Sequence, residues 1–199
     1  MFDPLPYATF SFVMSITPGP NNVMLTASGV NFGFRRTVPH IAGISAGCGV
    51  QLMGVCAGLG ALFTRWPLLQ TALQWVGAVY LLWLGWQLVR GGEMAERHAP
   101  APITFLQAMA FQFVNPKAWV MSLSAVTLFL PAGLSMLAAS AYLIALMVII
   151  NIPCITSWAL FGTALRGVLK RRSARLAFNA SMAAALVATG VIMVVQEPL

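Results

Sequence analysis

Lys117 is the residue of this chain whose position most demands a chemical explanation. It lies inside an apolar run over residues 105–130, where a lysine costs on the order of 3 kcal/mol on membrane-insertion scales. Its side chain reaches only about 6 Å, so from the centre of a bilayer core about 30 Å thick it cannot bring its charge to water. Such an ammonium group is typical of a site that binds an anionic group. If residues 105–114 instead form a re-entrant hairpin, Lys117 would still line a cavity.

Prolines interrupt three apolar runs, and each proline has an asparagine nearby. The three sequences are Thr17-Pro18-Gly19-Pro20-Asn21-Asn22, Asn115-Pro116-Lys117 and Asn151-Ile152-Pro153. A proline has no N–H to donate to the carbonyl four residues earlier, so a helix break is expected near mid-membrane in each run. A helix that restarts there offers free N–H groups and about half a positive charge, while the freed carbonyls offer the opposite polarity. The pattern predicts a binding site for a small zwitterion, although any single proline is also compatible with a simple kink.

The predicted site combines these breaks with nearby polar side chains. Lys117 and the N-termini of the half-helices are expected to hold a carboxylate, and Asn21 and Asn22 are expected to cap the helix that restarts. The amino group is expected to meet asparagine oxygens and the carbonyls freed at Met14, Ile16, Gln112 and Ile149. The candidate substrate-binding residues are Thr17, Pro18, Gly19, Pro20, Asn21, Asn22, Gln51, Gln112, Asn115, Pro116, Lys117, Asn151 and Pro153.

Acidic groups are absent from the middle of every apolar run, because Asp3, Glu93, Glu96 and Glu197 all lie at the edges or outside. The sequence therefore predicts no metal site and no cofactor. His40 could carry a proton, which leaves proton coupling open.

Gly43-Ile44-Ser45-Ala46-Gly47 matches the GxSxG pattern of serine hydrolases. That pattern requires a strand-to-helix turn and a positioned base, whereas here it lies in an apolar helix. Glycines 43 and 47, like glycines 54 and 58, are spaced for close helix packing instead.

The composition places these segments in a membrane. Of the 199 residues, 59% are hydrophobic and 8% are charged, against about 45–50% and about 25% in soluble domains. A soluble fold of this length has too little interior for so much apolar surface. The net charge of +7 does not indicate a nucleic-acid partner, because the basic residues stand between apolar runs, where they act as topology signals.

Six apolar spans are expected, over residues 6–29, 39–64, 68–89, 105–130, 135–165 and 176–195. Nine of the 11 Lys and Arg residues follow the first, third and fifth spans, whereas Arg65 alone follows the second or fourth. The positive-inside rule then predicts that both termini lie on the non-cytoplasmic side.

The predicted fold is an all-α integral membrane protein with six transmembrane helices. It forms a single membrane domain, with residues 1–90 as the first three-helix half, 91–102 as a linker and 103–199 as the second half. Because three spans per half is an odd number, the halves are expected to be inverted repeats with broken helices at the midplane. The glycines spaced for close helix packing are compatible with a homo-oligomer as well as with packing inside one chain.

The sequence resembles the LysE/RhtB family of amino-acid exporters. The resemblance rests on TPGPNN (17–22), GFRR (33–36), GAVYLLWLGW (77–86) and FVNPK (113–117) in this order, and it covers nearly the whole chain. It implies efflux of amino acids or close derivatives across the bacterial cytoplasmic membrane, driven by protons or by exchange. The PGPNN version looks most like the cysteine and O-acetylserine exporter branch. Many relatives carry Asp where this chain has Asn21, so a titrating carboxylate is not expected there.

Two alternatives belong to other classes. The first is a membrane scaffold or accessory subunit without transport activity of its own, in which the breaks serve packing against a partner. The second is a membrane enzyme that uses Ser45 and His40. We prefer a transporter, because only this interpretation explains Lys117 together with the matched breaks.

Overall fold

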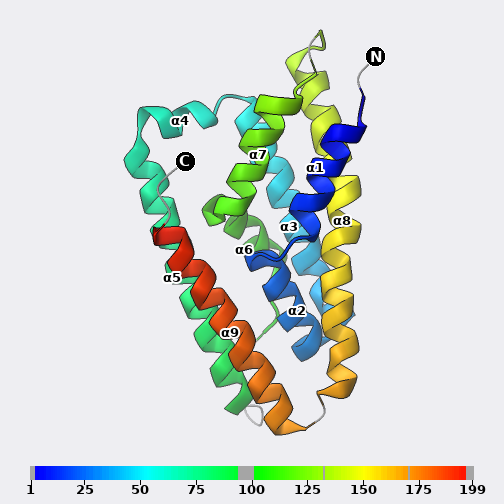
Figure 1. Ribbon diagram of the computed structural model, residues 1–199, viewed down its shortest axis with the longest axis vertical. Coiled ribbons are helices and arrows are strands. Elements are labelled where there is room, and N and C mark those ends of the chain that lie inside the picture. Colours follow the sequence, from blue (N-terminus) through cyan, green and yellow to red (C-terminus); the bar gives the residue numbers. More distant parts are fainter. Residues whose placement is uncertain (1–2, 94–100, 132, 170, 196–199) are drawn as a thin grey trace.

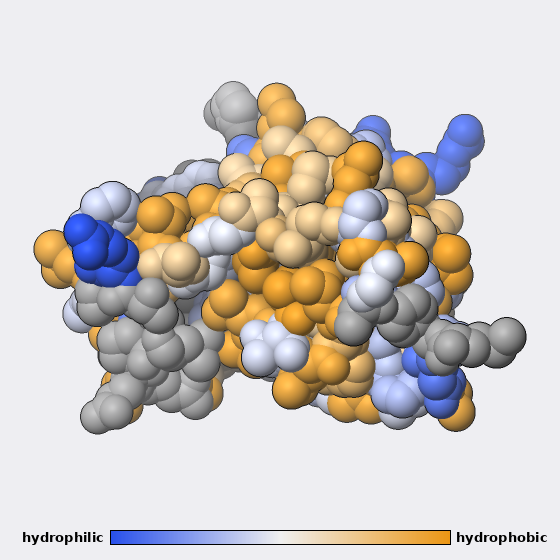
Figure 2. All heavy atoms as spheres, turned by 90° about the horizontal axis from the view of Figure 1, so that it is seen from above, coloured by the Kyte–Doolittle hydropathy of each residue, from blue (hydrophilic) through white to orange (hydrophobic). Residues whose placement is uncertain are grey.

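The computed structural model describes residues 3–93, 101–131, 133–169 and 171–195, and every regular element within these ranges is a helix. Four helices are long and apolar enough to cross a membrane: Phe34–Cys56, Thr71–Arg90, Met136–Val168 and Arg172–Ile192. Viewed along the long axis, apolar side chains cover much of the visible surface (Figure 2). The prediction of an all-α membrane protein is confirmed.

The first predicted span is a broken helix. α1 (Leu5–Ile16) ends at Thr17, which is extended, and α2 (Pro20–Phe32) begins with Pro20 in its first turn. α2 lies below α1 and is tilted relative to it, with the break near the middle height of the molecule (Figure 1). Each half is roughly 18–20 Å long at 1.5 Å per residue. The break predicted from the two prolines is confirmed.

The fourth predicted span is also interrupted. α6 (Phe105–Phe111) continues into a 3₁₀ turn, η1 (Gln112–Val114), and α7 (Pro116–Phe129) begins after an extended Asn115. The residue before a proline is disfavoured in the helical region, which explains why the helix stops there. The chain approaches α6 from the lower end and leaves α7 at the upper end (Figure 1). Residues 101–129 therefore cross the molecule and do not form a re-entrant hairpin.

The third predicted break is wrong. α8 (Met136–Val168) is one continuous helix of 33 residues with Pro153 inside it. A single proline removes one backbone hydrogen bond, and neighbouring helices can support the resulting kink.

The bounds of the second predicted span are also wrong. α3 (Phe34–Cys56) contains Pro39 instead of starting there, and a separate short helix, α4 (Gly60–Arg65), follows it. Gly58 lies in the intervening turn with a φ of +100°, which favours glycine. Glycines 54 and 58 therefore do not form the predicted helix-packing pair.

Two close helix contacts depend on glycine. A Cβ atom at Gly29 of α2 would clash with the backbone of α8 at Ala159, and one at Gly162 of α8 would clash with the backbone of α2 at Thr26. At Gly43 of α3, a Cβ would meet the carbonyl of Phe105 in α6. These contacts hold α2 against α8 and α3 against α6, which positions the two breaks.

α5 (Pro67–Glu93) and α9 (Arg172–Val195) pack against each other as a pair beside the remaining helices (Figure 1). α5 extends to Glu93, so the first residues of the predicted linker 91–102 are helical. Residues 94–100 of that linker lie outside the described part of the chain.

Candidate functional site

The Lys117 side chain connects the two breaks. Its Nζ atom donates to the Thr17 carbonyl at 2.8 Å, to the Thr17 Oγ1 at 2.9 Å and to the Pro18 carbonyl at 3.2 Å. A lysine ammonium has three N–H donors, and the three bonds use all of them. The positive charge of α7 is therefore held at the carbonyl end of α1, where the helix dipole is negative.

At the first break, the helix that restarts has no side-chain cap. Gly19 occupies the N-cap position of α2 and provides no side-chain cap. Asn21 and Asn22 lie inside the first turn, so the prediction that they cap this helix is wrong. Asn22 instead donates from Nδ2 to the carbonyls of Ser15 at 3.0 Å and Thr17 at 2.8 Å, which ties the end of α1 to the start of α2.

The second break is closed by its own chain. The Asn115 side chain accepts a hydrogen bond from the Lys117 backbone N–H at 3.1 Å, which caps α7. The Asn115 N–H in turn donates to the Gln112 carbonyl at 3.2 Å. This break therefore contributes the Lys117 side chain to the site rather than free backbone groups.

Gln112 is a second connection between the breaks and is completely buried. Asn21 Nδ2 donates to Gln112 Oε1 at 2.8 Å, and Gln112 Nε2 donates to Asn21 Oδ1 at 3.2 Å. The Gln112 carbonyl also accepts from Gln51 Nε2 at 3.0 Å. Gln112 thus holds the Asn21 side chain in place, and Gln51 in turn holds Gln112.

Asn151 reaches the site although its helix is not broken. Its Nδ2 donates to Ser15 Oγ at 3.0 Å, and its Oδ1 accepts from Ser45 Oγ at 3.3 Å. Pro153, by contrast, is exposed on α8. Ser45 bonds Asn151 and not His40, whose two ring nitrogens have no hydrogen-bond partner among the described residues. The described geometry therefore contains no nucleophile–base pair at Ser45.

The carbonyls predicted to receive an amino group are mostly occupied or distant. The Ile16 carbonyl accepts from Trp158 Nε1 at 3.1 Å, the Gln112 carbonyl accepts from Gln51, and the Ile149 residue is 68% exposed. The carbonyls that meet a cation are those of Thr17 and Pro18. They are left without helical partners because the amides four residues later, at Asn21 and Asn22, begin a new helix.

A cavity of about 30 Å³ lies where these groups meet. Of the predicted residues, it is lined by Gly19, Pro20, Asn21, Asn22, Asn115, Lys117 and Asn151. Met14, whose carbonyl was predicted to meet the amino group, also lines the cavity, whereas sequence reasoning missed Ser15, Cys48, Ala118, Met121 and Ile155. Most of these are apolar, and only their place on the inner helix faces could have identified them. The volume holds roughly two water molecules, so even a small amino acid requires the cavity to widen.

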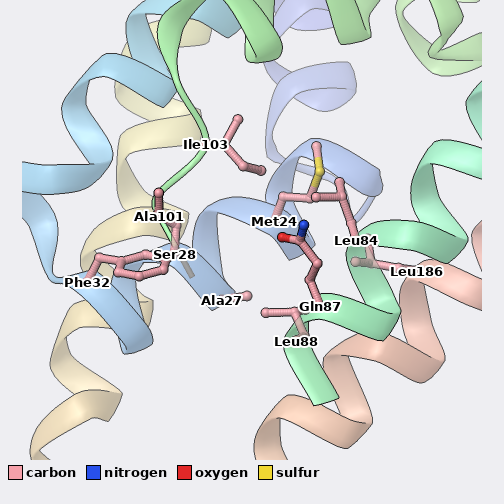
Figure 3. A pocket seen from close by; sticks show the side chains of 10 residues that line it. All are labelled: Met24, Ala27, Ser28, Phe32, Leu84, Gln87, Leu88, Ala101, Ile103 and Leu186. Carbon is pink, nitrogen blue, oxygen red and sulfur yellow. The ribbon is translucent and has the colours of Figure 1, made fainter. Parts of the chain in front are cut away.

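Thr17, Gln51 and Gln112 do not line this cavity. Thr17 bonds Lys117 and Gln112 bonds Asn21, which both line it, and Gln51 bonds Gln112. Pro116 instead lines a neighbouring cavity with Trp119. A further cavity of about 50 Å³ lies between α2, α5, α9 and residues 101–103 (Figure 3). Its lining is largely apolar and has no charged group, so it lacks the chemistry of the Lys117 site.

Broken helices that meet at a polar cavity in a membrane protein are typical of transporters. The family model described as "LysE type translocator" matches residues 12–197, and the chain therefore belongs to this family.

Curated relatives are named cysteine/O-acetylserine efflux protein. The one from Salmonella paratyphi A is 34% identical over 122 residues, which cover 61% of this chain and 62% of the relative. The one from Klebsiella pneumoniae is 32% identical over 127 residues, which cover 62% and 63% of the two chains. The chain thus spans about three-fifths of the length of the curated relatives it matches. No solved structure gives a significant match.

Proposed function

We propose that the protein exports amino acids or close amino-acid derivatives from the cytoplasm across the bacterial inner membrane. The family assignment and the names of the curated relatives support amino-acid efflux. Cysteine and O-acetylserine are the first substrates to test, because the relatives are named for them.

The observation that carries the proposal is an ammonium group at the cavity whose hydrogen bonds, among the described residues, all go to uncharged oxygens. Asp3 precedes α1 and α5 ends at Glu93, so neither acidic residue stands in a break segment. Lys117 is therefore satisfied by carbonyl and hydroxyl dipoles alone. A substrate carboxylate would supply the missing counter-charge, and charge-assisted hydrogen bonds of this kind are about twice as strong as neutral ones.

The proposed architecture is two inverted three-helix halves, with α1–α5 in the first and α6–α9 in the second. The strongest helix contacts between the halves support it, because exchanging the halves preserves them, although among the described residues the packing of α2 on α3 has no comparable counterpart between α7 and α8. α1 and α2 pack on α8, just as α6 and α7 pack on α3, while α3 packs on α8 and α5 on α9. Alternating access would then open the small cavity to each side in turn as the halves move.

The proposed orientation places both termini outside the cytoplasm. Arg35 and Arg36 lie in the first turn of α3. Arg90 lies in the last turn of α5, and Arg166 lies in the last turn of α8. These helix ends share the lower end of the molecule, whereas Arg65 ends α4 at the upper end (Figure 1). The positive-inside rule assigns the lower end to the cytoplasm. Proton coupling and self-association stay predictions.

The test is amino-acid release from cells that overexpress the protein. Cells are loaded with dipeptides to raise internal pools, and the medium is profiled by mass spectrometry against vector and Lys117→Ala controls with confirmed insertion. We expect one or a few amino acids to accumulate only with the wild type. Equal profiles in all three strains would contradict export and favour a scaffold or accessory subunit.

A further inference from the structure

The carbonyl end of α1 has the properties of a site for a primary ammonium group. The Thr17 carbonyl, the Thr17 Oγ1 and the Pro18 carbonyl surround one nitrogen at 2.8, 2.9 and 3.2 Å. Three acceptors match the three N–H donors of any primary ammonium, including the α-ammonium of an amino acid. The negative end of the α1 dipole adds to the attraction.

We infer that the Thr17 and Pro18 acceptors, which bond the cavity-lining Lys117 but do not line the cavity themselves, are the ammonium subsite for the substrate, and that Lys117 occupies this subsite until a substrate displaces it. The inference rests on the proposed function, because it assigns the amino end of the exported zwitterion. It adds a second role for Lys117, as an internal occupant that competes with the substrate.

The stem of Lys117 allows this exchange. The residue is half-buried, and within the described part of the chain its ammonium makes three hydrogen bonds, all to the first break. Gly19 provides the space for the stem, since a Cβ there would lie 2.9 Å from Lys117 Cδ and 3.2 Å from Nζ. The side chain can therefore leave the carbonyls without any movement of its own helix.

The exchange conserves charge. A zwitterion brings an ammonium to replace that of Lys117 at the carbonyls and a carboxylate to pair with the released Lys117. A primary amine without a carboxylate would leave two cations in the cavity with no anion, which is costly in a membrane interior. A carboxylic acid without an amine would leave the Pro18 carbonyl without its donor and the Thr17 carbonyl with Asn22 alone once it drew Lys117 away. The arrangement thus selects amino acids over amines and over simple acids.

The experiment measures cysteamine binding to the purified protein in lipid nanodiscs by calorimetry, with a reductant present. Cysteamine is the amine of cysteine without its carboxylate. It should bind Lys117→Met at least roughly tenfold more tightly than wild type, about 1.4 kcal/mol, because the subsite is then vacant. Lys117→Arg keeps a cation at the carbonyls and should bind cysteamine as weakly as wild type. 2-Mercaptoethanol, which has a hydroxyl in place of the ammonium, should show no gain in the variant.

Equal cysteamine affinity in wild type, Lys117→Met and Lys117→Arg would overturn the inference, because Lys117 would then not occupy an ammonium site. Lys117→Leu provides a second neutral variant if Lys117→Met fails to insert. The gain of cysteamine binding does not depend on which amino acid is exported. Failure of this test and failure of the release assay are therefore distinguishable.

Discussion

The two helix breaks are built differently, although both contain proline. At the break between α1 and α2, the Thr17 and Pro18 carbonyls both accept from the distant Lys117 ammonium, the Thr17 carbonyl also accepts from Asn22 Nδ2, and α2 has no side-chain cap. The break before α7 is completed locally, since Asn115 caps the helix from its own side chain. The first break therefore offers backbone polarity to the cavity, and the second offers one charged side chain.

This difference shows that the two halves of the site are complementary and not equivalent. Without Lys117, the Pro18 carbonyl would have no hydrogen-bond partner among the described residues, and a half-buried lysine alone would be a costly charge in the membrane. Together they satisfy each other in the absence of substrate. Variants that change one break should consequently affect either transport or stability, depending on which of the two roles they remove.

The largest effect on stability is expected for Gln112→Leu, which removes the side chain that joins the two breaks. Asn21 Nδ2 would lose its part-buried bond to Gln112 Oε1, at a cost of about 2 kcal/mol for the donor left unpaired. Thermal unfolding followed by tryptophan fluorescence measures the loss. Gln107→Leu is the matched control, because that exposed side chain only caps α6. A Tm no lower than that of the control would contradict the role of Gln112.

Gly19→Ser should reduce export roughly tenfold without a loss of stability, because displacement of a site group by about 1 Å has large effects. The backbone at Gly19 is extended, with φ at −176°, so serine fits and can cap α2. Its Cβ, however, would meet the Lys117 stem at 2.9 Å. Gly167→Ser, where a Cβ meets nothing within 4 Å, is the control. Wild-type flux in Gly19→Ser would show that the first break tolerates a filled cap.

Asn115→Ala should, in contrast to Gly19→Ser, lower mainly the stability of the protein and not its export. The expected loss is about 1 kcal/mol for a lost helix cap. The lost bond is the one from the Lys117 N–H to the Asn115 side chain. Ser135→Ala removes the corresponding cap of α8, where the Ala138 N–H donates to Ser135 Oγ at 3.3 Å. The two variants should lower the Tm to a similar extent. If Asn115→Ala reduced export more than Gly19→Ser, the division of roles between the breaks would be wrong.

The smallest effect is expected for Thr17→Val, which removes one of the three acceptors around the Lys117 ammonium. Export of L-cysteine should fall about two- to fivefold, in line with about 0.5–1 kcal/mol for one hydrogen bond. Thr127→Val is closely matched, since each threonine hydroxyl also donates to the carbonyl four residues earlier. The two variants are compared by initial flux in proteoliposomes. An equal rate for both would mean that the Thr17 hydroxyl makes no contribution.

The breaks at Pro18–Pro20 and at Pro116 could be predicted from the sequence, but the one at Pro153 was wrongly expected. The reason is local. Pro18 and Pro20 remove two donors within three residues, and Asn115 directly precedes its proline, where it can cap the next helix. Asn151 stands two residues before Pro153 and cannot take that position, so α8 continues.

The identity of the free carbonyls could not be predicted, because it depends on side chains from distant segments. Trp158 covers the Ile16 carbonyl from α8, and Gln51 covers the Gln112 carbonyl from α3. The sequence shows that prolines free acceptors, whereas only the packing of α8 and α3 determines which acceptors stay available. Lys117 was found from its charge alone, since no apolar neighbour can compensate it.

The most direct test of the account is the flux of L-cysteine out of proteoliposomes that contain wild type, Lys117→Arg or Lys117→Met in equal, correctly inserted amounts. The account predicts clear flux for wild type, partial flux for Lys117→Arg, which keeps the charge, and a loss of at least roughly tenfold for Lys117→Met, about 1.4 kcal/mol. Wild-type flux in Lys117→Met would contradict the claim that this ammonium and the first break together form the substrate site.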